Sequence, residues 1–300
     1  KGDWSAENET TGWQFISSPI KNAPISQFIP AQGDYDLYKY NGAEDMEWIN
    51  HKSHIEDFEK EFFSGRAYLA SYDYFDKVIL SGKLNAEKTF ARQLSYNADK
   101  ELANFHLLGN PFTFDMDLKY VTWYNLVKGF AVVKADGNYE YRTTDNNGII
   151  PVGDGFFVQA TGTYPSISYN EVATEPATRG SEKANSINVI ASGKAGKDNV
   201  IVNFAGQAEG FDKLQNFNDA IATVYVTENG KNYGIANVDE NTTEVALNFN
   251  AKQMGSYTIS LDVNGEFETV TLVDRFTGVE TNMLEDEYTF TATGNDNVNR

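Results

Sequence analysis

The stretch Gly12-Trp13-Gln14-Phe15-Ile16-Ser17-Ser18-Pro19-Ile20 is repeated in outline as Asn104-Phe105-His106-Leu107-Leu108-Gly109-Asn110-Pro111-Phe112. Each copy places an aromatic residue and a spacer before two large apolar residues, and then two small or polar residues before a proline. Such an apolar run is typical of a buried β-strand, and proline ends it because proline has no N–H to donate to a neighbouring strand. We therefore expect the N-terminal part of the chain to be a diverged duplication.

Two further pairs of segments extend the repeat. Residues 39–42 correspond to residues 134–137, and residues 65–70 correspond to residues 153–158. All three pairs keep their order along the chain. We expect two strand-rich halves whose apolar faces pack on one another as a β-sandwich or jelly roll.

Short strands separated by turn residues are expected throughout the chain. Segments such as 35–40 and 139–142 alternate apolar and polar side chains, as antiparallel strands with one exposed face do. Asn41-Gly42 and Asp136-Gly137 tolerate the positive φ that a tight hairpin needs, so we expect the chain to reverse at both. The only helical candidate in the first half is residues 55–63, where apolar residues recur at roughly helical spacing.

A change in composition near residue 180 divides the chain. The sequence there is small and polar and is interrupted by proline and glycine, which is typical of a linker. We expect an all-β protein with two antiparallel β-sandwich domains: a duplicated sandwich or jelly roll at 1–178, a linker at 179–186, and a smaller immunoglobulin-like sandwich at 187–300. Within the second domain, hairpins are predicted across residues 193–199 and at Glu228-Asn229-Gly230-Lys231.

Composition limits the classes of function. Asp and Glu number 43 against 24 Lys and Arg, giving a net charge of -19, and a surface of this sign disfavours nucleic acid and anionic membranes as partners. The absence of cysteine excludes disulfides and thiol chemistry. No apolar run is long enough to predict membrane insertion. Because the sequence begins at Lys1 without an apolar signal core, we expect a mature or trimmed chain from which any export signal has been removed.

Several segments resemble a known group of proteins. The closing module of many Bacteroidetes surface and secreted proteins is similar to residues 198–204, 210–212, 255–259, 270–278 and 287–290. The region that accompanies that module is similar to Gly12-Trp13, Asn110-Pro111-Phe112 and residues 153–158. The resemblance implies export and an extracellular or outer-membrane surface location, often beside adhesin, protease or glycan-handling domains. It implies no catalytic residue.

Two residue pairs have side chains that metal or acid–base chemistry uses. His51 and His54 lack the His-Glu-x-x-His spacing of zinc proteases, so we expect a surface loop or the start of a helix and no metal. Asp115 and Asp117 would face one way in an extended segment, as a pair of glycosidase carboxylates requires. Because acidic residues are abundant in this chain, a solvated loop is the preferred interpretation.

Loop segments rich in Asp, Asn and Gly suggest ion or nucleotide sites only superficially. Residues 136–138 and 145–148 offer oxygens of the kind that bind calcium, but neither segment fits the twelve-residue calcium loop. We expect turns there and no cofactor, with calcium as the alternative. Residues 193–198 and 153–155 lack the spacing of phosphate-binding and dinucleotide-binding loops.

Exposed aromatic residues are the remaining candidates for ligand binding. Trp48, Trp123 and Tyr124 fall near predicted strand ends or loops, where flat rings could stack on sugars. We expect an exported, non-catalytic cell-surface module for adhesion, scaffolding or domain presentation, with a host or surface protein as its partner. The alternative is a glycan-binding accessory module of a polysaccharide-degrading system. The weakest hypothesis is a glycoside hydrolase built on Asp115 and Asp117.

Overall fold

The structure is a computed structural model that describes residues 12–43, 45–72, 79–170, 184–206, 208–293 and the backbone of 297–299. Its described part confirms the predicted all-β class. Helical structure within it is limited to short 3₁₀ turns: Ile25–Gln27, Ile55–Asp57, Glu101–Asn104 and Leu118–Tyr120. None of the helices in this part of the chain is long and apolar enough to cross a membrane.

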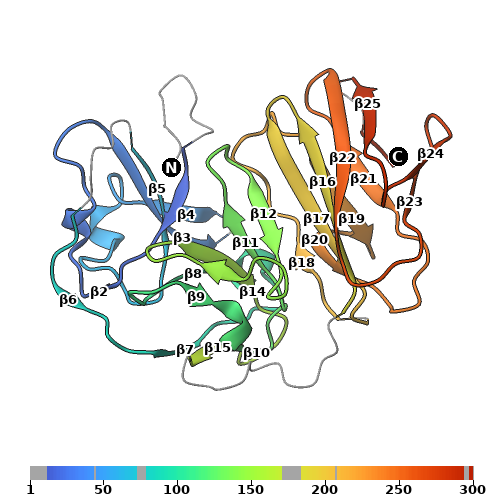
Figure 1. Cartoon of the computed structure of the whole chain (residues 1–300). Coiled ribbons are helices and arrows are strands. Elements are labelled where there is room, and N and C mark those ends of the chain that lie inside the picture. The colour runs from blue at the N-terminus through green and yellow to red at the C-terminus, as the bar shows by residue number, and fades with distance from the viewer. Residues whose placement is uncertain are drawn as a thin grey trace. The chain divides into compact units, whose positions relative to one another are not determined.

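The chain divides into two units by its internal contacts. The first comprises Lys1–Gly137 and Arg142–Gly180, and the second comprises Asn138–Tyr141 and Ser181–Arg300. The chain therefore contributes one short segment to the second unit before it completes the first. Most of the predicted linker at 179–186 lies outside the described residues. Figure 1 follows the chain from blue at the N-terminus to red at the C-terminus.

Two sheets of the first unit share one strand order. In one sheet the order is β1 (Gln14–Ile16), β5 (Tyr68–Tyr72), β3 (Tyr35–Ala43) and β4 (Met46–Asn50). In the other sheet, the corresponding order is β8 (Phe105–Gly109), β14 (Gly155–Gln159) and β11 (Phe130–Val133). The pairs β8–β14 and β14–β11 are antiparallel. The repeated sequence segments occupy matching strands, β1 with β8 and β5 with β14. This correspondence supports the duplication, which stays a prediction.

Equivalent positions of the two repeats exchange hydrogen bonds. The Gly109 N–H donates to the Gly65 carbonyl at 3.0 Å, and the Ser17 N–H donates to the Gly153 carbonyl at 2.8 Å. Ser17 corresponds to Gly109 in the sequence repeat, and Gly65 corresponds to Gly153. Each half therefore donates from the end of one strand, or just beyond it, and accepts in one turn.

The two halves approach so closely that side chains are excluded at two strand positions. A Cβ atom at Gly155 would lie 2.3 Å from the Cβ of Ala67 and 2.8 Å from the carbonyl oxygen of Leu108. A Cβ atom at Gly109 would lie 2.4 Å from the Cβ of Ser17. Real Cβ atoms do not approach other atoms this closely, so both positions require glycine.

A three-stranded sheet completes the framework of the first unit. Its order is β10 (Val121–Tyr124), β15 (Ser166–Asn170) and β7 (Thr89–Gln93), which leaves β7 at an edge. Short antiparallel pairs join β2 (Ile20–Lys21) to β6 (Lys83–Leu84) and β9 (Met116–Asp117) to β13 (Ile149–Ile150). Buried side chains of β8, β10, β11, β14 and β15 pack together in one apolar cluster.

One large sheet forms the second unit. Its strand order is β25 (Tyr288–Ala292), β22 (Gly255–Asn264), β16 (Ser186–Gly193), β17 (Gly196–Asn203), β20 (Lys231–Asn237), β19 (Thr223–Glu228), β21 (Leu247–Asn250) and β26 (Asn297–Asn299), with β18 (Phe211–Asp212) beside β20. β23 (Thr271–Asp274) and β24 (Val279–Asn282) form a separate hairpin. Inward-facing side chains from seven of these strands enclose one core, as a β-sandwich does. The pair β17 and β20 is parallel, unlike the other described pairs.

Three of the predicted chain reversals are confirmed. Gly193 lies opposite Gly196, and Glu228 lies opposite Lys231. Asn229 and Gly230 between the latter two have φ of 51° and 79°, as a tight two-residue turn requires. The turn at Asp136-Gly137 also forms, since the Gly137 N–H donates to the Lys134 carbonyl at 2.9 Å.

The prediction that the chain reverses at Asn41-Gly42 was wrong. β3 continues to Ala43, which lies opposite Met46, and a bulge between Tyr40 and Ala43 contains Gly42 with a φ of +68°. Positive φ is as useful in a bulge as in a turn, so the dipeptide alone does not fix the reversal.

The predicted helix at 55–63 was also wrong. It is reduced to the single 3₁₀ turn Ile55–Asp57. The chain then extends, and Phe58 and Phe62 become buried in the core below β5. A segment this short gains more from burying its rings than from helix propagation.

The segment Asn138–Tyr141, which belongs to the second unit, is held there through Tyr141. Tyr141 lies on β12 (Tyr139–Arg142). The Tyr141 N–H donates to Asn199 Oδ1 and the Asn199 Nδ2 donates to the Tyr141 carbonyl, both at 2.9 Å. The Tyr141 hydroxyl accepts from the Leu214 N–H at 2.6 Å. A Cβ atom at Gly234 would lie 2.2 Å from the Tyr141 ring. The Asn199 amide therefore replaces the backbone of a neighbouring strand.

Beside Tyr141 lies a buried ion pair. Nζ of Lys213 is 2.8 Å from Oδ2 of Asp198, and the two side chains are 7% and 0% exposed. Nζ of Lys213 also donates to the Asn199 carbonyl at 2.8 Å, and Asp198 accepts the Val224 N–H at 2.8 Å. Burial lowers the pKa of Lys213 and raises that of Asp198, while their mutual attraction opposes both shifts. Each charge therefore needs the other.

The substitution Gly155→Ala should reduce the free energy of unfolding by about 1–3 kcal/mol, because the new methyl group collides with Ala67 and the Leu108 carbonyl. The matched control is Gly255→Ala, which also begins a strand but meets no atom within 4 Å. Chemical denaturation of both variants measures the difference. Equal stability of the two variants would contradict the close approach.

The substitution Lys213→Met should destabilise the second unit by about 3–5 kcal/mol, because it leaves the Asp198 carboxylate buried without a counter-ion. The double variant Lys213→Met/Asp198→Asn should recover most of that loss. Urea denaturation followed by hydrogen exchange in the second unit measures both. A single variant as stable as the wild type would show that the pair is dispensable.

Candidate functional site

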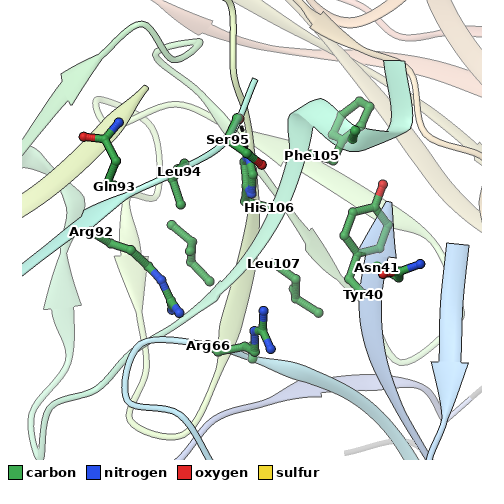
Figure 2. A pocket seen from close by; sticks show the side chains of 13 residues that line it. Tyr40, Asn41, Arg66, Arg92, Gln93, Leu94, Ser95, Phe105, His106 and Leu107 are labelled. Carbon is green, nitrogen blue, oxygen red and sulfur yellow. Dashed lines mark hydrogen bonds between the residues drawn. The ribbon is translucent and has the colours of Figure 1, made fainter. Parts of the chain in front are cut away.

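The first unit contains a cavity of about 480 Å³. Four of its lining residues have ionisable side chains: Tyr40 from β3, Arg66 from the loop before β5, Arg92 from β7 and His106 from β8. Figure 2 shows these side chains gathered around one space. A volume of this size falls within the range of small-molecule sites, about 300–1,000 Å³.

Arg92 lies on the inward face of its strand. In the register of the three-stranded sheet, Arg92 lies opposite Ile167, which lies opposite Trp123. Directly paired residues of antiparallel strands share a face, and Ile167 is only 1% exposed. Arg92 therefore takes a position where the alternation of β7 would place an apolar side chain, and its guanidinium lines the cavity.

Arg66 approaches the cavity with a counter-ion. Its guanidinium forms an ion pair with Glu59, whose carboxylate also lies 3.6 Å from Nζ of Lys39. The guanidinium carbon of Arg66 lies 5.6 Å from the centre of the Phe63 ring, a cation–π distance. The Glu59 carboxylate thus pairs with two cations, Arg66 and Lys39, and neither of these pairs includes Arg92.

His106 is held in one orientation by the backbone. Its Nε2 donates to the Ser95 carbonyl at 2.9 Å, the dashed contact in Figure 2. The nitrogen must carry a proton, because a carbonyl oxygen only accepts. Burial lowers the pKa of His106, and the charges of Arg92 and Arg66 lower it further, against the opposing effect of the Ser95 carbonyl. The imidazole is therefore neutral near pH 7.

Aromatic and amide groups complete the lining. The Tyr40 hydroxyl donates to the Leu102 carbonyl at 2.7 Å, and burial raises the Tyr40 pKa so that the hydroxyl keeps its proton. The remaining side chains with polar groups or rings are Asn41, Gln93, Ser95 and Phe105. The cavity therefore combines cations, neutral hydrogen-bonding groups and aromatic rings.

The candidate ligand-binding aromatics lie outside this lining. Trp48 on β4 is half-buried, and its ring contacts Tyr40 at a centroid distance of 5.0 Å and Phe157 at 5.9 Å. Trp123 on β10 packs against the apolar cluster of its sheet. Tyr124 follows it on the opposite face and is 58% exposed. A role for these three residues in ligand binding stays a prediction.

The histidine and aspartate pairs take part in local hydrogen bonds. Nδ1 of His51 lies 3.0 Å from the Tyr35 hydroxyl, and Nδ1 of His54 lies 2.9 Å from Oγ of Ser53. Oδ1 of Asp115 accepts the Val152 N–H, and Oδ1 of Asp117 accepts the Lys119 N–H. Neither aspartate lines the cavity. In the part of the chain that the structure describes, no group of three or more His, Cys, Asp or Glu side chains could hold a metal.

Sequence reasoning missed Arg66, Arg92 and His106 because they are far apart in the chain. One local signal was available: Phe90 and Arg92 occupy alternate positions of one strand, so an arginine follows a phenylalanine on the same face. The strand register was needed to show that this face is the inward one.

Comparison with protein-family models, curated proteins and solved structures gives no significant match. The cavity's own geometry is therefore the basis for a functional proposal.

His106 should titrate below its ordinary value of 6.5. Because its pKa is lower in the folded than in the unfolded chain, it stabilises the fold fully above pH 6.5 and loses this contribution as the pH falls toward the folded pKa. Nuclear magnetic resonance titration of the ring protons measures this, with the signal assigned by its absence in His106→Gln. A His106 pKa above 6.5 would contradict the described surroundings.

Proposed function

We propose that this chain is a non-catalytic binding module of an exported surface protein and that the cavity of its first unit is the ligand site. The observation that carries the proposal is the cavity of about 480 Å³, lined by Tyr40, Phe105 and a set of polar side chains. A module that serves only as a scaffold has no need of such a cavity. The surface location is supported by the resemblance of the strand and turn segments to Bacteroidetes surface proteins.

A glycan is the ligand class that this lining favours. Sugars present hydroxyl groups for amide and guanidinium donors and apolar C–H faces for aromatic rings. Asn41 supplies an amide, Arg92 supplies a guanidinium, and Tyr40 and Phe105 supply rings. The lining thus offers both kinds of contact within one site. This agrees with the hypothesis of an accessory module in a polysaccharide-degrading system.

Blocking the cavity tests the proposal. Ser95→Trp places a large ring at an exposed lining position and leaves the backbone carbonyl that His106 uses intact. We expect saturable binding of the full chain to at least one oligosaccharide of a mixed neutral and acidic array, and a loss of affinity of about tenfold or more in Ser95→Trp. Titration calorimetry of the best ligand gives the affinities.

The matched control is Ser256→Trp, which adds the same ring at an exposed position of β22 in the second unit. This variant should bind like the wild type. Equal affinity of the wild type and both variants would place the ligand elsewhere and overturn the proposal, as would an array without any binding.

A further inference from the structure

The cavity has more positive charge than the described residues neutralise. The Arg66 guanidinium is paired with Glu59, which it shares with Lys39. No hydrogen bond or ion pair of the Arg92 side chain is found among the described residues, although it lies on the inward face of β7. A buried charge without a partner is costly, so it needs either solvent or a bound counter-ion.

The excess of positive charge is local and contrasts with the rest of the chain. The protein has a net charge of -19, so an anion approaching most of its surface meets repulsion. Within the cavity the arginines act on each other: burial lowers the pKa of Arg92, and the charge of Arg66 lowers it further. An anion between them would remove this like-charge repulsion.

We propose that the cavity binds the oxyanion of an acidic sugar, a carboxylate or a sulfate ester, with Arg92 as its principal contact and Arg66 as the second. This inference rests on the proposed glycan-binding function and specifies the class of glycan. A guanidinium presents two parallel N–H groups that match two oxygens of either anion. Partial burial strengthens this contact, because the surroundings screen charge less than water does.

His106 adds a pH dependence to the same site. Its imidazole faces Arg92 from β7, Arg66 from the loop before β5, and the Ser95 carbonyl, and it is neutral near pH 7. Protonation at lower pH adds a third positive charge to the lining. The affinity for an acidic sugar should therefore rise as the pH falls below 6.5, while the affinity for a neutral sugar should not.

The test compares acidic and neutral forms of one sugar by titration calorimetry on the full chain at fixed ionic strength. The probes are sodium glucuronate, glucose 6-sulfate, methyl glucoside and inorganic sulfate. We expect at least one acidic sugar to bind about tenfold or more tightly than methyl glucoside, and Arg92→Gln to remove this difference. The better of the two acidic sugars identifies the anion.

The control Arg275→Gln removes the same charge from an exposed arginine of the second unit that is paired with Glu244. It should keep the preference for the acidic sugar. Arg92→Lys keeps the charge but loses the planar fork, and should weaken acidic-sugar binding while preserving the fold if Arg92→Gln proves unstable.

The outcomes separate the two proposals. Equal affinity for acidic and neutral sugars, or an unchanged preference in both Arg92 variants, would overturn the anion site and leave glycan binding in place. Arg92 would then serve only as an inward charge that protects the edge of its sheet. No binding of any probe would also overturn the anion site. Binding of inorganic sulfate as tightly as glucose 6-sulfate would overturn the glycan function as well.

Discussion

The close approach of two strand pairs in the first unit is the constraint on which the candidate site depends. At Gly109 and Gly155 there is no room for even one methyl group, because Ser17 and Ala67 occupy the space. The hydrogen bonds between Gly65 and Gly109 and between Ser17 and Gly153 fix this approach. The same approach sets Arg66 and Ala67 beside Leu107 and Leu108, which all line the cavity. The site is therefore built on the junction between two sheets, where close packing leaves the backbone little room to shift.

Much of the fold could be predicted from the sequence because it depends on local chemistry. Alternation predicts strands, and Asn229-Gly230 predicts its hairpin since both residues adopt positive φ. The same reasoning failed at Asn41-Gly42, where a bulge uses the same conformation. It could not foresee the parallel pairing of β17 and β20, or that Tyr141 belongs with the second unit, because both depend on residues distant in the sequence. Predictions were reliable where one segment determines its own conformation.

The candidate site was much less predictable than the fold. Sequence patterns directed attention to rings and to closely spaced acids or histidines, such as Trp48, Trp123, and Asp115 with Asp117. The cavity instead draws Arg66, Arg92 and His106 from three separate strands or loops. No regular spacing in the sequence connects these three residues. Only the register of β7 on β15 shows that Arg92 faces inward. A site assembled from distant segments has no local sequence signature unless the chemistry demands fixed spacing, as a zinc or phosphate loop does.

The placement of Asn138–Tyr141 in the second unit also bears on how a chain of two units can diversify. Proteins of several domains are commonly described as modules that recombine at the linkers between domains. In this chain, genetic recombination at a point near residue 180 would separate Tyr141 from the residues that hold it. The Tyr141 ring packs against Gly234, and the Tyr141 backbone bonds to the Asn199 amide. A second unit joined to another first domain would lack the Asn138–Tyr141 segment. A first unit joined to another second domain would leave the Tyr141 ring without its packing partner. The two units are thus expected to be inherited as a pair, and their sequences to change together around this tyrosine.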